Sequence, residues 1–118
     1  MLQKLVGIIF LVSAALLVAC GGNAGGDGTP ITIVAKEFKF EPATITVTPG
    51  QAVKLTLKNE GVIDHDLMIK AVGFKILVGP GKAETKMFVA PAAPGTYDIE
   101  CNVAGHKDAG MIGTFVVK

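Results

Sequence analysis

The stretch from Tyr97 to Phe115, which reads YDIECNVAGHKDAGMIGTF, decides how the rest of this chain is interpreted. It holds Cys101, His106 and Met111, with four residues between each consecutive pair. Glycine, asparagine and aspartate fill the intervals and favour turns, whereas residues typical of strands lie on both sides. One loop between two strands is therefore expected to bring a thiol, an imidazole and a thioether together.

These three side chains form a candidate metal-binding set. Thiolate and imidazole bind several transition metals, but a thioether favours copper, because soft sulfur suits Cu(I) while nitrogen also holds Cu(II). A trigonal site needs a second imidazole, and the chain has 2 histidines in all. The other one, His65, ends a loop and precedes the apolar run Leu67 to Ile69. We therefore predict a site for one Cu(I)/Cu(II) ion, with the ligands His65, Cys101, His106 and Met111.

Each ligand has an ordinary structural interpretation when it is taken alone. A lone cysteine is usually a small buried hydrophobic residue, and a lone methionine usually fills a core. The metal site is favoured because both histidines and one of the 2 cysteines fall at ligand spacing. Zinc sites use similar nitrogen and sulfur ligands, but they are built from Cys, His, Asp and Glu or keep a position for water. Met111 therefore argues against zinc.

Three segments resemble the small blue copper proteins, the cupredoxins. They are HDLMI starting at His65, PGTYDIEC ending at Cys101, and AGMIGTFVV, which contains Met111. They follow the order and spacing of that family over residues 31–118, and the long interval between Cys101 and His106 is similar to that of the auracyanins more than to that of the plastocyanins. The resemblance implies a type 1 site with Met111 as a long axial ligand. It also implies transfer of single electrons, with no enzymatic activity.

This chain departs from much of the family at the residues that follow two of the ligands. Many cupredoxins have asparagine after the first histidine and serine or threonine after the cysteine, whereas this chain has Asp66 and Asn102. In the family these two side chains tie the ligand segments together, and here the Asn102 amide can donate to the Asp66 carboxylate, so we expect the tie to persist; an Asp66 turned to solvent is the alternative. An ionised Asp66 would then favour Cu(II) and lower the reduction potential. The binuclear copper domain of respiratory oxidases needs a second cysteine in the loop, and residues 102–105 contain none.

From Ile31 onward the chain has the pattern of short strands joined by turns. Ala52 to Lys58 alternates apolar and polar residues, as expected for a strand with one buried face. Leu67 to Ala71 is predicted to be a strand, whereas residues 72–78 suit a strand, a turn or a short helix. About seven to eight strands predict an all-β Greek-key sandwich, cupredoxin-like. An immunoglobulin-like adhesion module would explain the strands but would leave the four ligands unexplained.

The N-terminus has the pattern of a targeting segment. A short basic start is followed by the apolar run Leu5 to Leu17 and by small residues before Cys20. This resembles a bacterial lipobox, in which residues 1–19 are removed and Cys20 receives a lipid; a plain secretory signal or an uncleaved anchor is the alternative. Residues 20–30 are rich in glycine and are predicted to be a flexible tether. Residues 31–118 are then the copper-binding domain.

Composition limits the function further. The formal net charge is +1, which gives no indication of nucleic-acid binding. We predict a monomeric electron carrier, not an enzyme, held by a lipid at the cell membrane and facing the periplasm or another extracytoplasmic space. A copper chaperone or copper-storage protein with the same ligands is the alternative.

The expected partners are redox proteins that dock near His106: a cytochrome, an oxidase, or a photosynthetic or respiratory complex. An apolar patch around His106 suits brief contacts of small area. Its predicted members are Val62, Ile63, Val103, Ala104 and Ala109. An acidic rim would steer a basic partner. Its predicted members are Glu60, Asp64, Asp98, Glu100 and Asp108.

Overall fold

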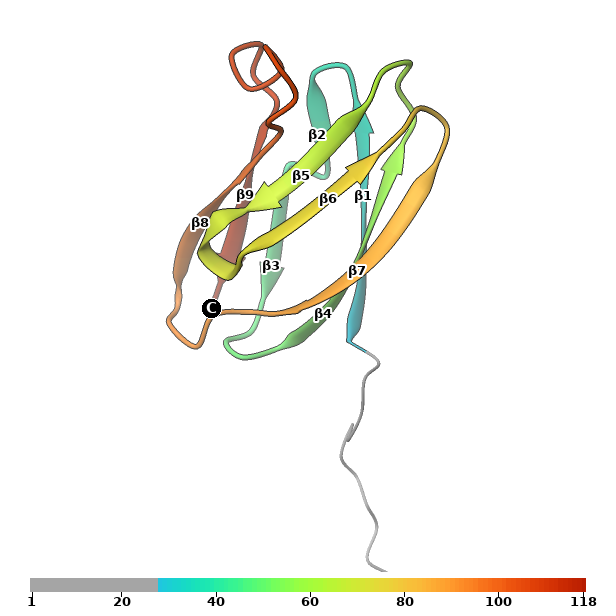
Figure 1. Ribbon diagram of the computed structural model, residues 1–118. Helices are drawn as coiled ribbons and strands as arrows, with labels where there is room; N and C mark the ends of the chain where they lie inside the picture. Colours follow the sequence, from blue (N-terminus) through green and yellow to red (C-terminus); the bar gives the residue numbers. More distant parts are fainter. Residues whose placement is uncertain (1–27) are drawn as a thin grey trace, which may run out of the picture.

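The computed structural model describes residues 28–118, which form strands joined by short loops (Figure 1). The strands are β1 (Thr29–Lys36), β2 (Lys39–Glu41), β3 (Thr44–Val47), β4 (Ala52–Asn59), β5 (His65–Ile69), β6 (Phe74–Val78), β7 (Ala83–Val89), β8 (Gly95–Glu100) and β9 (Ile112–Val117). One 3₁₀ turn, η1 (Lys70–Val72), lies between β5 and β6. Within these residues no helix is long and apolar enough to cross a membrane.

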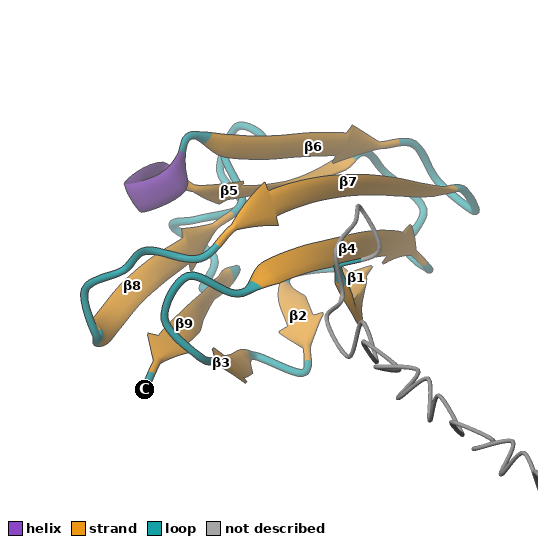
Figure 2. Cartoon of the chain, turned by 90° about the horizontal axis from the view of Figure 1, so that it is seen from below, coloured by secondary structure: helices purple, strands orange, loops and turns teal. Residues whose placement is uncertain are grey.

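The strands form two packed sheets, which Figure 2 shows from the end opposite the β1–β2 turn. One sheet has the order β2-β1-β4-β7 and the other β3-β9-β8-β5-β6. The pairs β1–β4 and β3–β9 are parallel, so the chain crosses between the sheets as well as folding back in hairpins. The predicted all-β sandwich is confirmed. It has nine strands in the described part of the chain, where seven to eight were expected, because the three residues of β2 pair separately.

The core lies between the sheets and follows the alternation of the sequence. On β4, Val53, Leu55 and Leu57 are fully buried while the residues between them face outward, as predicted. Burying each such side chain stabilises the fold by about 1.5–3 kcal/mol. Phe88 on β7 reaches across the layers, with its ring centroid 4.9 Å from that of Phe74 and 5.6 Å from that of Phe115. These contacts join the two sheets.

Two boundaries differ from those expected. The strand predicted at Leu67 to Ala71 begins at His65 and ends at Ile69, because the chain turns into η1 and then adopts a positive φ of 62° at Gly73, which favours glycine. The ambiguous segment 72–78 is largely strand β6, which pairs with β5 along its whole length. His65 is therefore the first residue of a paired strand, opposite Val78, rather than the last residue of the loop before one.

The described residues begin near the predicted boundary between tether and domain. Thr29 and Pro30, expected at the end of the tether, already pair with β4, so strand β1 starts before Ile31. The predicted signal segment 1–19, the lipid site at Cys20 and the tether as far as residue 27 lie outside the described residues.

Candidate metal centre

The predicted ligands come from two places at one end of the sandwich. His65 is the first residue of β5, and Cys101 follows the last residue of β8. His106 and Met111 lie in the loop that joins β8 to β9, drawn in red at the top of Figure 1. The loops after β1 and β4 reach the same end of the molecule. Tertiary structure thus brings together residues that are 36 positions apart, as His65 faces the segment that begins at Cys101.

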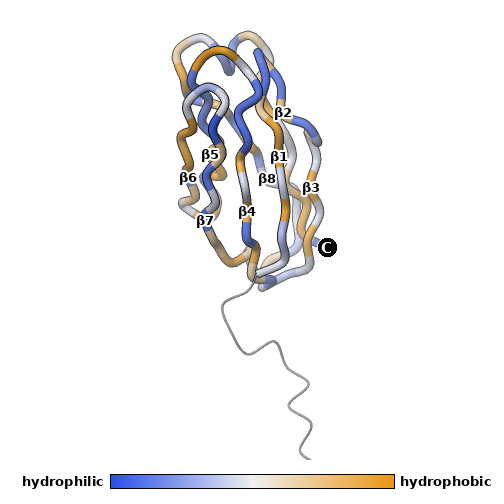
Figure 3. Tube along the Cα trace, turned by 90° about the vertical axis from the view of Figure 1, so that its right-hand side faces the viewer, coloured by the Kyte–Doolittle hydropathy of each residue, from blue (hydrophilic) through white to orange (hydrophobic). Residues whose placement is uncertain are grey.

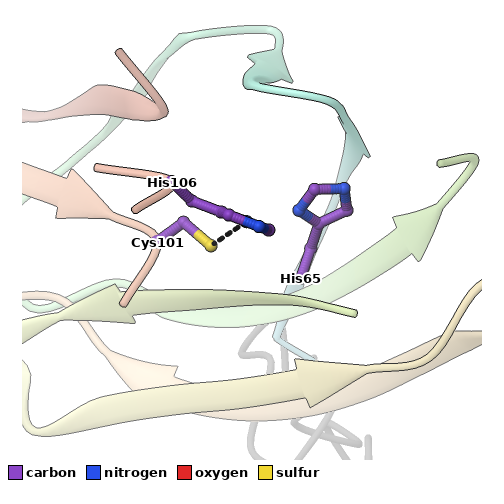
Figure 4. Close-up of side chains that lie close together, drawn as sticks. All are labelled: His65, Cys101 and His106. Carbon is purple, nitrogen blue, oxygen red and sulfur yellow. Dashed lines mark hydrogen bonds between the residues drawn. The ribbon is translucent and has the colours of Figure 1, made fainter. Parts of the chain in front are cut away.

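The side chains of His65, Cys101 and His106 point toward one another (Figure 4). One ligand atom from each lies within 4.8 Å of the others, and all three residues are buried. The Sγ atom of Cys101 is 3.5 Å from Nδ1 of His106, and the two imidazole rings have centroids 5.0 Å apart. A thiol and two imidazole nitrogens therefore already share one small enclosed space.

Backbone hydrogen bonds close the ligand loop around this space. The N–H of Cys101 donates to the carbonyl of Met111 at 3.1 Å, and the N–H of Met111 donates to the carbonyl of His106 at 3.0 Å. Gly105 and Gly110 turn the chain with φ of 80° and 97°, a region where side chains with a Cβ are disfavoured. Met111 is fully buried. The fourth predicted ligand is thus held at the same place by its own backbone.

The chemistry of the site fits a metal ion. Nδ1 of His65 is buried and has no hydrogen-bond partner within residues 28–118, which is costly for a polar atom unless something else binds it. Burial also raises the pKa of the Cys101 thiol, so the thiolate requires a positive charge beside it. A coordinated metal supplies that charge and deprotonates the thiol. Two nitrogens, a thiolate and a buried thioether are the donor set of type 1 copper.

Glu37, in the turn between β1 and β2, also contacts the site and was not predicted from the sequence. Its Oε1 atom lies 3.2 Å from Nε2 of His65 and accepts hydrogen bonds from the N–H groups of Val62 at 2.7 Å and Ile63 at 3.3 Å. The hydrogen bond from Val62 is the main cause that lowers the pKa of the Glu37 carboxyl. Because Glu37 and His65 are 28 positions apart in the sequence, no local motif could reveal this contact.

Asp66 and Asn102 do meet, but not through the Asn102 side chain. The backbone N–H of Asn102 donates to Oδ1 of Asp66 at 2.5 Å, while the Asn102 residue is exposed. The Asp66 side chain is almost fully buried, and its other oxygen lies 3.5 Å from Nζ of Lys75. The two ligand segments are therefore tied as expected, with a backbone donor in place of the expected amide.

The predicted apolar residues lie in the loops at the ligand end of the molecule, and most of them are exposed. Val62 is 81% exposed and Ile63 39% exposed. Both are in the β4–β5 loop, whose hydrophobic part is drawn in orange at the top of Figure 3. Val103 is half-buried, while Ala104 and Ala109 are exposed. Phe38, which was not predicted, is 42% exposed and places its ring edge-on to His106, with centroids 5.1 Å apart.

The predicted acidic rim is smaller than expected. Glu100 is only 5% exposed and is paired with Nζ of Lys107 at 2.5 Å and of Lys70 at 2.7 Å. The hydrogen bonds from these lysines, that of Lys107 first, lower the pKa of the Glu100 carboxyl. Glu100 therefore anchors the ligand loop through Lys107 and does not contribute to the rim. The other four predicted acidic residues are exposed.

Comparison with known proteins agrees with this geometry. The model of the cupredoxin-like domain family matches residues 7–117. The chain belongs to this family. Since the four ligands also fit copper, the cupredoxin-like domain carries a single type 1 copper site of the His-Cys-His-Met kind.

Individual relatives of the cupredoxin-like domain support the assignment. Plastocyanin of Dryopteris crassirhizoma is 33% identical over 95 residues, covering 69% of this chain and 89% of its own. The copper-resistant cuproprotein CopI of Rubrivivax gelatinosus is 27% identical over 117 residues, covering 83% of this chain and 71% of its own. The structure of reduced auracyanin from Roseiflexus castenholzii superposes with a TM-score of 0.69 at 27% identity, covering 79% of this chain and 99% of its own.

Proposed function

We propose that this protein is a carrier of single electrons and not an enzyme. The observation that carries the proposal is the enclosed ligand set, in which His65, Cys101 and Met111 are fully buried and three ligand atoms lie within 4.8 Å of one another. When bound there, copper supplies a one-electron change between Cu(II) and Cu(I). An enclosed set of four protein ligands offers a substrate little access, so electron exchange is favoured over catalysis.

The surrounding residues hold the four ligands in fixed positions. His65 is fixed in a paired strand, while the loop from Cys101 to Met111 is closed by its own backbone hydrogen bonds. A packed surrounding resists rearrangement, because protein interiors are as dense as organic crystals. The same four side chains can therefore serve both oxidation states.

A redox partner is proposed to dock over His106. This ligand is 5% exposed, whereas His65 is fully buried, so His106 lies nearer the surface. Phe38, Val62 and Ile63 provide exposed apolar area beside it. Small contacts of this kind suit transient electron-transfer encounters with a cytochrome, an oxidase, or a photosynthetic or respiratory complex. The exposed acids Glu60, Asp64, Asp98 and Asp108 would favour a basic partner.

We further propose that the protein is lipid-anchored on the extracytoplasmic side of the cell membrane. The support is the N-terminal sequence, in which a basic start, an apolar run and small residues precede Cys20. The sequence between Cys20 and the start of β1 at Thr29 is rich in glycine, a composition that supports a tether on which the domain would move near the membrane. Mass spectrometry of the mature protein tests this directly, since a lipidated Cys20 at the N-terminus is expected and an intact residue 1 would contradict it.

Copper transfer or storage is the second candidate function. It is favoured by the similarity to a relative whose name describes a copper-resistant cuproprotein. The same ligands could deliver the metal rather than the electron. Retention of the metal therefore distinguishes the two functions.

The deciding experiment cycles the copper-loaded protein between oxidised and reduced forms in the presence of a competing chelator. An electron carrier is expected to keep its intense visible absorption in the oxidised form through many cycles. A chaperone would lose copper to the chelator, most readily as Cu(I). Steady loss of the absorption with cycling would overturn the electron-carrier proposal.

A further inference from the structure

Two consecutive residues in the turn between β1 and β2 each contact one of the histidine ligands. Glu37 contacts His65, and Phe38 packs against His106. His65 is fully buried, whereas the Glu37 side chain keeps 31% of its surface exposed at the edge of the site. A carboxylate has thus been placed against the outer nitrogen of the buried histidine.

The carboxylate is held in place by the loop that precedes His65. Its Oε1 atom accepts from the N–H groups of Val62 and Ile63, so its position is fixed independently of the histidine. Gly61 makes this approach possible: a Cβ there would fall 2.8 Å from Nε2 of His65 and far closer still to Oε1 of Glu37, where real Cβ atoms are not found. Any larger residue at position 61 would have to displace the carboxylate or the imidazole.

The contact selects one form of the imidazole. An acceptor beside Nε2 favours the tautomer in which Nε2 carries the proton, and this leaves the lone pair of Nδ1 free. Nδ1 is the buried atom that has no partner within residues 28–118, and Figure 4 shows it on the side of the His65 ring that faces His106 and Cys101. Ligand histidines commonly donate their second N–H to a carboxylate, which fixes ring orientation and raises ligand basicity.

We propose that Glu37 is a positioning residue that holds His65 as the Nε2-protonated tautomer, aims Nδ1 at the metal and favours Cu(II). This inference rests on the copper site of the proposed function and adds a residue from outside the four ligands. Because the carboxylate bears a negative charge, it strengthens electron donation by the imidazole more than a neutral acceptor would.

The first test reads the His65 tautomer by nitrogen NMR of the metal-free protein at about pH 8, above the usual pKa of histidine. In the wild type, the Nε2-protonated form is expected. Glu37→Gln keeps a carbonyl oxygen and should retain that tautomer, whereas Glu37→Ala should populate both forms. Persistence of the single tautomer in Glu37→Ala would overturn the proposal.

The second test uses the copper-loaded protein and a charge-matched control. Glu37→Gln is expected to raise the reduction potential, and Glu37→Ala should also weaken copper binding by about 10–100-fold. Glu60→Gln removes an equal charge from an exposed position in the β4–β5 loop and should change neither property. Equal shifts in Glu37→Gln and Glu60→Gln would mean that only charge matters, and the proposal would be wrong.

These readouts remain informative whatever the outcome of the redox-cycling experiment. The tautomer is measured without metal, so it does not depend on whether the protein carries electrons or copper. If Glu37→Ala fails to fold, the potential of Glu37→Gln decides, since glutamine still offers an acceptor to Val62 and Ile63. An unchanged potential in a folded Glu37→Gln variant would then overturn the proposal.

Discussion

The two histidine ligands lie in regions built in different ways. His65 begins a strand that pairs with β6, is fully buried, and has a carboxylate against its outer nitrogen. His106 lies in a loop of turns whose shape depends on two glycines with positive φ, and it is nearer the surface beside the exposed ring of Phe38. One ligand is therefore fixed by the sheet and the other by a short loop.

The two histidine ligands therefore have different roles in one site. The sheet supplies a rigid and fully buried ligand, while the loop supplies the ligand nearer the surface, where we propose that a partner docks. Loops positioned by a rigid scaffold commonly carry functional residues. The hydrogen bond from Asn102 N–H to Asp66 and the ion pair of Lys107 with Glu100 tie the loop to the scaffold.

Of all the changes considered, loss of the Cys101 thiolate should have the largest effect on the copper site, because the thiolate and both histidines bind the same ion. In Cys101→Ser the intense visible absorption of the oxidised copper protein is expected to vanish, since that absorption needs a thiolate bound to copper. Circular dichroism should show a folded sandwich, as serine is small enough for the site. A blue Cys101→Ser variant would contradict the ligand assignment.

Removing each histidine in turn tests the comparison directly. Both His65→Gly and His106→Gly should weaken copper binding by more than the roughly 10–100-fold expected for an outer partner. Added imidazole should restore the spectrum of His106→Gly, because that ring lies near the surface. It should restore His65→Gly much less, because that ring is enclosed. Equal rescue of the two variants would mean that the two regions do not differ in access.

Replacing the Met111 thioether should affect the copper site less than removing a histidine. Met111→Leu keeps a buried apolar side chain of similar volume and should leave the fold and the visible absorption in place. The reduction potential should rise, by an amount on the order of 60 mV, which is a tenfold change in the one-electron equilibrium. Electrochemical titration measures the shift. An unchanged potential would show that Met111 does not contribute to the site.

The smallest effect is expected for a substitution in the β1–β2 hairpin that contacts no ligand, and it should appear only in the stability of the fold. Hydrogen bonds from Lys39 and Lys36 lower the pKa of the exposed Glu41 carboxyl, so this group stabilises the folded state above its unfolded pKa of about 4.3. The contribution is lost as the pH falls through the lowered folded value. Glu41→Gln should thus slightly reduce thermal stability at neutral pH and match the wild type in acid, with the copper spectrum unchanged at both pH values. A spectral change would mean that the whole hairpin, and not Glu37 alone, acts on the site.

The sequence by itself determined the class of fold and the ligands. Alternation on β4 predicted its buried face because side chains in a strand point to opposite sides. The spacing of Cys101, His106 and Met111 predicted one metal loop because a single loop can hold all three. These features are local, so they can be read from residues close together in the chain.

Only the tertiary structure decided which residues support the ligands. Glu37 and Phe38 reach the histidines because the β1–β2 turn lies at the same end of the sandwich as the β4–β5 and β8–β9 loops. Glu100 is not part of the exposed acidic rim, because ion pairs with Lys70 and Lys107 compensate the burial of its carboxylate. The strand of His65 likewise began earlier than expected because β6 pairs with it. Each of these outcomes depends on contacts between distant segments, which no local pattern encodes.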